Sequence, residues 1–161
     1  MNDHPEAHRI FQDLLDRSGG AMLSRDMTAL LRWFAIPNTV ESFEGRRTLN
    51  TEAETRALFE TIMARQHEQC ITHMIRRVTH AEFRDPDTIW ATHETRYVYH
   101  NKVLSDSPHE GFSILHRYPD CWKVHHAQFT VDGRNPLNSA VKQPYALDRG
   151  DNDDTQARTS G

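Results

Sequence analysis

The sequence has little that would support a disulfide framework, a membrane span or a nucleic-acid-binding surface. Its 161 residues include two cysteines, Cys70 and Cys121, so we expect reduced thiols. No apolar run is long enough to span a bilayer, and the polar start MNDHPEAHR does not resemble a signal peptide. The formal net charge is −4, and the arginines are scattered rather than arranged in a stripe. We therefore expect a cytoplasmic protein that binds neither nucleic acid nor membranes.

Sequence motifs for common cofactors and metals are also missing. There is no Ser-His-Asp arrangement, phosphate loop or dinucleotide fingerprint, so no cofactor is predicted. The adjacent pair His125-His126 is the one arrangement that suggests a metal. Adjacent residues of a strand point to opposite faces, so these two side chains cannot chelate one ion together. No metal site is predicted.

The length predicts one domain followed by a polar tail. A chain of 161 residues can bury one core but is short for two domains. The apolar fraction of 37% is low, partly because few large apolar residues follow Asp132. We expect a domain over residues 1–132 and a tail over residues 133–161 that is either disordered or wrapped around a partner subunit.

Three helices are predicted in the first half of the chain. Apolar residues at helical spacing predict a helix over 5–17, which Ser18-Gly19-Gly20 would end or bend. Ser24 is expected to cap a second helix that reaches about Trp33. Thr51 and Glu54 form a capping box that opens a third helix, which ends near Gln69 and has one apolar face, formed by Ala57, Leu58, Ile62 and Met63.

Strands are predicted mainly in the second half. Two short polar strands, 39–43 and 46–49, have the character of a sheet edge, and residues 70–100 form a long β-hairpin. Two further strands, 111–118 and 122–131, follow. Helices first and antiparallel strands last indicate an α+β domain, with helices packed on one face of a curved sheet.

The hairpin carries most of the unusual polar residues. If Phe83 and Thr88 close its turn, Arg77 lies opposite Glu94, as either a structural ion pair or a pair that orients a substrate. Neither face is purely apolar. One face holds Ile71, His73, Ile75, Arg77, Thr79, Phe83, Trp90, Thr92, Glu94, Arg96, Val98 and His100; the other holds Thr72, Met74, Arg76, Val78, His80, Ile89, Ala91, His93, Thr95, Tyr97 and Tyr99.

Three stretches carry a resemblance to a known family. They are SRDMTALLRWFAIPNTVESFEG, the capped helix leading into CITHMIRR, and FSILHRYPDCWKVHHAQF. In this order they resemble the nuclear transport factor 2-like superfamily, in particular its SnoaL-like and scytalone dehydratase-like branch, over residues 5–132. The resemblance implies a cone-shaped, curved antiparallel sheet with the N-terminal helices on its concave face. It also implies a homodimer. The superfamily includes dehydratases, isomerases, cyclases and plain binding modules.

The resemblance also suggests site residues. His73, in Ile71-Thr72-His73, is similar to a pocket histidine of the scytalone dehydratase-like proteins, so its face of the hairpin is expected to line the pocket. A second histidine of those enzymes would fall at Val98, with His100 as the nearest substitute. Their early tyrosine and aspartate would fall near Met22 and Leu23, which argues against scytalone dehydratase activity itself.

The remaining candidates follow from this orientation. Arg96 would receive a ligand carboxylate or lie at a solvated strand end. A three-residue loop at Pro119–Cys121 sets Ser113 opposite Ala127 and Leu115 opposite His125. Ser113 and His125 then face the pocket while His126 faces outward. Three aromatic side chains are expected to line an apolar cavity or simply the core: Phe11, Trp33 and Trp90.

Two functions are compatible with these features. The first is a domain that binds a small apolar or aromatic molecule, with lyase or isomerase chemistry in which His73 is the acid or base and Glu94 and Arg77 tune it. The predicted ligand-binding residues are Trp33, Trp90, Arg96, Val98, His100, Ser113 and His125. The second is a non-catalytic binding or dimerisation module. In either case Tyr97 and Tyr99 would anchor a dimer through the outer sheet face.

Overall fold

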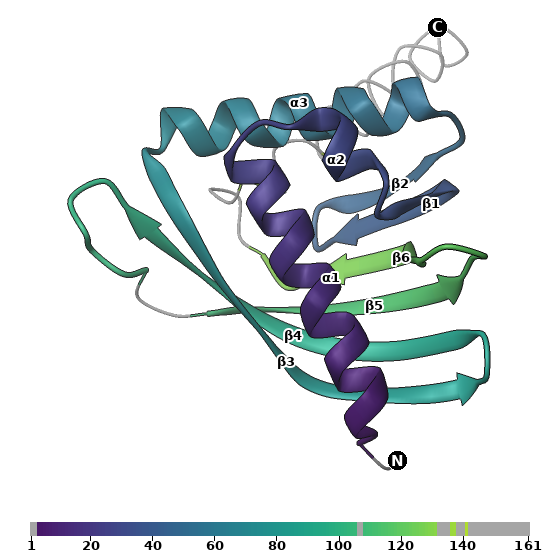
Figure 1. The fold of residues 1–161 in the computed structure, drawn as a ribbon. Coiled ribbons are helices and arrows are strands. Elements are labelled where there is room, and N and C mark those ends of the chain that lie inside the picture. The colour runs from purple at the N-terminus through teal and green to yellow at the C-terminus, as the bar shows by residue number, and fades with distance from the viewer. Residues whose placement is uncertain (1–2, 106–107, 132–135, 138–140, 142–161) are drawn as a thin grey trace, which may run out of the picture.

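The computed structural model describes residues 3–105, 108–131, 136–137 and 141 (Figure 1). The chain begins with two helices and two strands, followed by a third helix and four further strands. In chain order the elements are α1 (Pro5–Leu23), α2 (Met27–Leu31), β1 (Phe34–Ser42), β2 (Gly45–Leu49), α3 (Glu52–Glu68), β3 (Ile71–Asp85), β4 (Thr88–Tyr99), β5 (His109–Arg117) and β6 (Trp122–Phe129).

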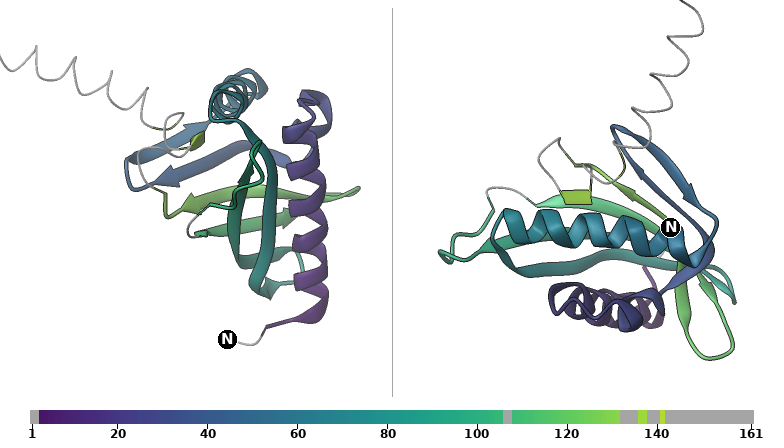
Figure 2. Two further views of the ribbon diagram at one scale, coloured as in Figure 1. Left: turned by 90° about the vertical axis from the view of Figure 1, so that its left-hand side faces the viewer. Right: turned by 90° about the horizontal axis from the view of Figure 1, so that it is seen from above.

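The strands form one curved sheet in the order β2-β1-β6-β5-β4-β3. All neighbouring pairs are antiparallel except β1 and β6, which are parallel, so the sheet is mixed rather than purely antiparallel as predicted. The helices α1 and α3 pack against the same face of the sheet, and we call this face the inner face (Figure 2). The predicted α+β class is confirmed, and β2 is an edge strand as its polarity indicated.

Helix α1 is longer than predicted because its small residues are packing positions. The helix continues through Ser18-Gly19-Gly20 to Leu23. Ser18 and Gly19 are buried, and a Cβ added at Gly19 would lie 3.7 Å from side-chain atoms of Met74 and Arg76. These small residues therefore do not end the helix. They allow β3 to pack closely against it.

The predicted cap of α3 is confirmed and that of α2 is wrong. Asp26, not Ser24, caps α2, because its carboxylate accepts a hydrogen bond from the amide of Ala29. Thr51 caps α3 as predicted, since its hydroxyl accepts from the amide of Glu54 at 3.1 Å. The Glu54 carboxylate accepts from the amide of Asn50 instead of Thr51.

The predicted hairpin pairing is correct from His73 to Val78 and wrong at Ile71 and near the turn. Arg77 pairs with Glu94 as predicted, but Phe83 pairs with Ile89 and Asp85 with Thr88. The register shifts between Val78 and His80, where Thr79 is the extra residue of a β-bulge. The bulge reverses the alternation, so Ala81 and Phe83 lie on the same face as Val78 and not with Arg77.

A second bulge explains an error in the closing strands. Ser113 pairs with Ala127 as predicted, but Leu115 pairs with Val124 and not with His125. His125 is the extra residue, and its ring stacks on His116 with centroids 4.4 Å apart.

The core consists of two clusters of buried residues on the inner face. One joins α1 to the middle of the sheet through Phe11, Leu15, Ile89 and Leu115. The other joins α3 to β1 and β2, and Val141 of the predicted tail packs into it. Most of residues 133–161 lie outside the described residues, so the predicted division at 132 stays a prediction.

The side chain of Gln12 ties α1 to β3, an edge strand of the sheet. Its amide nitrogen donates to the carbonyl of Arg76 and its amide oxygen accepts from the amide of Val78, each at 2.9 Å. The pair of bonds reproduces the pattern of a neighbouring strand. A further bond of this kind joins the Asp3 carboxylate to the amide of Ala81 at 2.8 Å. These contacts satisfy backbone groups that would otherwise lack partners under the helix.

We expect Gln12→Leu to lower the free energy of unfolding by about 1–3 kcal/mol, because two partly buried backbone groups of β3 lose their partners. Urea denaturation followed by circular dichroism would measure the change. Gln128→Leu is the matched control, since the exposed Gln128 side chain donates to the Glu41 carboxylate and bonds to no described backbone group. Equal effects of the two substitutions would contradict the role of Gln12.

Candidate functional site

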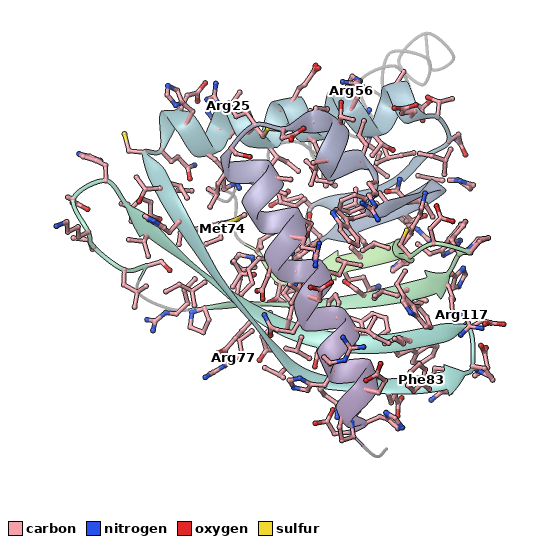
Figure 3. All side chains as sticks on the ribbon, viewed as in Figure 1. Arg25, Arg56, Met74, Arg77, Phe83 and Arg117 are labelled. Carbon is pink, nitrogen blue, oxygen red and sulfur yellow. The ribbon has the colours of Figure 1, made fainter. Side chains whose placement is uncertain are left out.

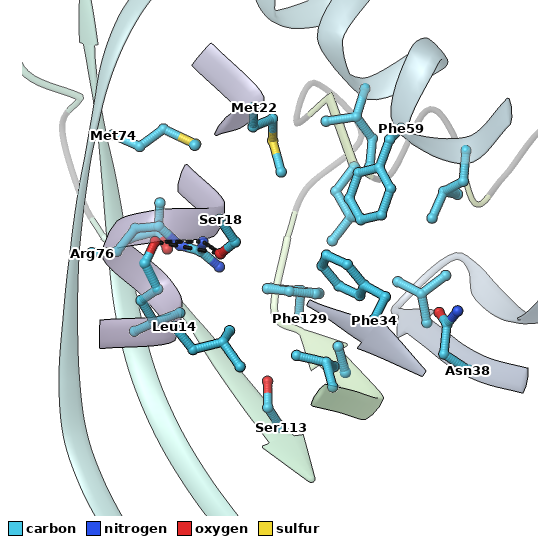
Figure 4. A pocket seen from close by; sticks show the side chains of 18 of the residues that line it. Leu14, Ser18, Met22, Phe34, Asn38, Phe59, Met74, Arg76, Ser113 and Phe129 are labelled. Atoms are coloured by element: carbon cyan, nitrogen blue, oxygen red, sulfur yellow. Dashed lines mark hydrogen bonds between the residues drawn. The ribbon is translucent and has the colours of Figure 1, made fainter. Parts of the chain in front are cut away.

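A cavity lies between α1, α3 and the inner face of the sheet (Figure 4). Its volume is about 80 Å³, counted as the space open to the centre of a water-sized sphere. Most of its lining is apolar, and the polar lining groups come from α1, α3 and β1 and from strands β3 to β5. The lining residues include Phe11, Leu14, Leu15, Ser18, Met22, Phe34, Asn38, Val40, Phe59, Ile62, Gln66, Met74, Arg76, Thr95, Tyr97, His109, Ser113, Val124, Ala127, Phe129 and Leu137.

Aromatic rings form one side of the cavity. Phe34 of β1 and Phe59 of α3 have ring centroids 4.6 Å apart, and Phe129 of β6 lies beside them (Figure 4). Phe11 of α1 lines the cavity as predicted. Flat apolar walls of this kind suit an aromatic or compact aliphatic molecule.

Most polar groups at the cavity wall are bonded to the protein. The Asn38 amide donates to the carbonyl of Ala35 at 2.9 Å and to the hydroxyl of Thr55 at 3.0 Å. The Gln66 amide contacts the sulfur atoms of Met22 and Met74 at 3.3 and 3.4 Å. These groups are therefore structural parts of the wall.

Arg76 of β3 is the charged group on the opposite side of the cavity. Its Nη1 donates to the Leu15 carbonyl at 3.4 Å and to the Ser18 hydroxyl at 3.3 Å, both on α1 (Figure 4). Burial lowers the pKa of Arg76 to about 10, against smaller opposing effects of Tyr97 and Asp16. At neutral pH the guanidinium therefore remains positively charged.

His93 of β4 lies next to two aromatic cavity residues. Its side chain is 1% exposed, and its ring meets Phe11 and Phe129 edge to face at 5.4 and 5.8 Å. Neither ring nitrogen bonds to a described residue. Burial, followed by the nearby charges of Arg76 and His109, lowers the pKa of His93 well below its usual value. The imidazole is therefore neutral in the folded protein.

Gly111 of β5 leaves room for the His93 ring. A Cβ at this position would lie 2.5 Å from Cε1 of His93, closer than van der Waals contact allows. The histidine and the glycine are directly paired across β4 and β5. The large ring on one strand therefore requires the absence of a side chain on the other.

The predicted catalytic residues do not line the cavity. His73, Arg77 and Glu94 lie on the outer face, where the Arg77 side chain is 73% exposed and forms an ion pair with Glu94 (Figure 3). His73 Nδ1 lies 3.0 Å from the Thr72 hydroxyl. The resemblance to scytalone dehydratase-like proteins assigned the inner face to the wrong side of the hairpin. A chemical role for these three residues stays a prediction.

Six of the predicted ligand-binding residues also lie elsewhere. Trp90 meets Phe112 on the outer face, 5.7 Å between centroids, and Arg84 lies over its ring. Arg96 donates to the Ser105 carbonyl, which holds it beside the loop after β4. The other four lie outside the cavity lining. Trp33 lies in a shallow depression with Arg32 and Trp122, and Val98 forms a β-bridge with Leu104. His100 lies in the turn after β4, and His125 lies at the β6 bulge.

Ser113 is the predicted ligand-binding residue that lines the cavity. It is buried on β5, and its hydroxyl points into the open space (Figure 4). The sequence missed Arg76, Tyr97 and His109 as lining residues. One available signal was that Val78, Ile89 and Ala91, which are apolar, fall in the same predicted face set as Arg76 and Tyr97.

Comparisons with known proteins agree on the fold. No protein-family model matches the chain, and no curated protein matches its sequence. Solved structures do match. A protein of unknown function with a cystatin-like fold from Nostoc punctiforme has a TM-score of 0.62 at 15% identity, covering 85% of this chain and 99% of its own.

Two further structures give the fold its name. A protein of unknown function from Pseudomonas putida, described as nuclear transport factor 2-like, has a TM-score of 0.59 at 14% identity, covering 81% of this chain and 90% of its own. This chain has the nuclear transport factor 2-like fold. A ketosteroid isomerase-like protein from Erwinia carotovora atroseptica matches with a TM-score of 0.58 at 9% identity, covering 79% of this chain and 97% of its own. The predicted fold is confirmed, whereas membership of the superfamily and of its SnoaL-like branch stays a prediction.

Two further properties concern the described part of the chain. None of its helices is long and apolar enough to cross a membrane. Within residues 3–105, 108–131, 136–137 and 141, no three histidine, cysteine, aspartate or glutamate side chains gather where they could hold a metal ion.

The neutral state of His93 predicts a pH dependence of stability. Because its folded pKa is depressed, the unfolded chain binds a proton near pH 6.5 that the folded chain does not. Its contribution to stability is therefore complete above about pH 6.5 and is lost as the pH falls below it, with a slope of up to about 1.4 kcal/mol per pH unit.

The variant His93→Leu should reduce this slope between pH 7 and 5, measured by urea denaturation at each pH. His73→Leu, which removes an exposed histidine from the outer face, should leave the slope unchanged. Identical slopes in the wild type and in His93→Leu would show that His93 accepts a proton without unfolding.

Proposed function

We propose that this nuclear transport factor 2-like domain binds a small, largely apolar molecule in the cavity between α1, α3 and the inner face. The observation that supports the proposal is the aromatic and aliphatic lining around open space, in a region where a folded core is normally filled. The ketosteroid isomerase-like neighbour is consistent with a fold that accommodates such ligands.

Binding without catalysis is favoured over a lyase or isomerase reaction through His73. A general acid or base must lie within hydrogen-bond reach of the bound molecule, and His73 is on the other face of β3 from the cavity. Tyr97 and His109 line the cavity and are the remaining groups that could exchange a proton with a ligand. The geometry therefore supports a ligand-binding domain more directly than an enzyme.

The substitution Ser113→Phe should abolish binding, because the cavity has room for little more than one aromatic side chain. Benzyl alcohol is a suitable neutral probe, titrated against ¹⁵N-labelled protein and followed by amide chemical shifts. In the wild type the shifts should centre on the lining residues. Ile114→Phe is the matched control, since its side chain lies on the opposite face of the same strand.

Loss of benzyl alcohol binding in Ser113→Phe, with a folded spectrum and with binding retained in Ile114→Phe, would support the proposal. Shifts in the wild type that spread over the surface, or binding that Ser113→Phe leaves unchanged, would refute it.

The proposal includes a homodimer formed through the outer face, as the family likeness implies. Tyr97 cannot anchor it as predicted, because Tyr97 lines the cavity, and Tyr99 lies at the end of β4 on the same side. Ile75 is the better anchor, since it is 53% exposed on the outer face of β3.

Light scattering coupled to size exclusion should give twice the monomer mass for the wild type and the monomer mass for Ile75→Glu. Ile36→Glu places the same charge at a residue of β1 that is 45% exposed and should remain dimeric. A monomeric wild type would remove the dimer from the proposal.

A further inference from the structure

Arg76 and Arg77 are adjacent in the sequence but have opposite surroundings. Arg77 points away from the sheet and is neutralised by Glu94. Arg76 points to the cavity and forms no ion pair with any described carboxylate. The nearest acidic group that acts on it, Asp16, is exposed on α1 and accepts a hydrogen bond from Gln12. The cavity therefore contains one positive charge that nothing in the described chain balances.

The hydrogen bonds of Arg76 leave most of its donors available. Both bonds to described residues come from Nη1, and both are long, at 3.3 and 3.4 Å. Nε and Nη2 make no hydrogen bond to a described residue, and neither atom is fully enclosed by the protein. A guanidinium has five donors in a planar fork, so this one can still bind an acceptor through two parallel bonds.

A lone charge at the wall of an apolar cavity is costly for a structural residue. Neutral contacts with one carbonyl and one hydroxyl replace only part of the hydration that the guanidinium gives up. The Leu15 carbonyl also accepts from Ser18, so it does not depend on Arg76 for a partner. Arg76 thus satisfies no group of the fold that would explain its presence.

We propose that Arg76 binds the carboxylate of a small, otherwise apolar monocarboxylate whose hydrocarbon part, aromatic or aliphatic, occupies the cavity. This inference rests on the proposed function, since it names the chemical class of the molecule bound there. A carboxylate is planar, fits the fork of Nε and Nη2, and has the one negative charge that balances Arg76. The apolar remainder would lie against Leu14, which is beside Arg76, and extend toward Phe34 and Phe129 on the other side of the cavity (Figure 4).

The test compares benzoate with benzyl alcohol, a neutral molecule of similar size, by calorimetric titration against three proteins. The wild type should bind benzoate at least about tenfold more tightly than benzyl alcohol. Arg76→Met should lose this preference and keep its affinity for benzyl alcohol. Arg77→Met removes the neighbouring, paired arginine on the outer face and should behave as the wild type.

Stability provides a second readout that separates binding from structure. Without ligand, Arg76→Met should melt at a temperature no lower than the wild type, because it replaces a partly buried, unbalanced charge by an apolar chain. Benzoate should raise the melting temperature of the wild type and not that of Arg76→Met. If Arg76→Met does not fold, Arg76→Lys keeps the charge without the fork and should bind benzoate more weakly than the wild type.

The outcomes distinguish this inference from the proposed function. Equal affinity of the wild type for both probes would overturn the carboxylate assignment and leave the cavity as a binding site. Failure of both probes to bind would overturn the inference and the proposed function together. A benzoate preference that survives in Arg76→Met, or tighter binding of phenyl phosphate than of benzoate, would also overturn the assignment.

Discussion

The two hydrogen bonds between the Gln12 side chain and β3 fix the relation of α1 to the sheet, and the rest of the interior depends on that relation. An edge strand under a helix needs partners for its backbone, and one amide side chain provides them in the geometry of a neighbouring strand. With β3 held in this position, Ser18 and Gly19 lie against it, and the side of the hairpin that carries Val78 becomes the inner face.

The same contacts place the guanidinium of Arg76, which no carboxylate of the described chain pairs with. Gln12 holds the carbonyl of Arg76, while Leu15 and Ser18 receive its guanidinium, so α1 positions both the backbone and the head group of this residue. The charge in turn acts on His93, whose imidazole stays neutral between the rings of Phe11 and Phe129. Packing and electrostatics in this interior are therefore consequences of one helix-to-strand contact.

Sequence patterns predicted the elements and the pairing of Arg77 with Glu94, because turn residues, capping and cross-strand charge are local signals. They could not decide which side of the hairpin faces inward. Each side mixes apolar and charged residues, and the adjacent arginines Arg76 and Arg77 are chemically identical in a sequence. The register shifts of the sheet, such as the bulges at Thr79 and His125, were also invisible, since they arise from the fit between strands and not from residue type.

The bulge at Thr79 bears on how the length of this hairpin can vary during evolution. Thr79 has no opposite residue on β4, so its loss would leave Val78 paired with His93 and His80 with Thr92 without exchanging either face. The loss of a residue between His73 and Val78, where the pairing is regular, would instead exchange the faces on one side of the deletion. Loss of a residue is thus compatible with this interior where β3 already has an extra residue and disruptive where the pairing is regular.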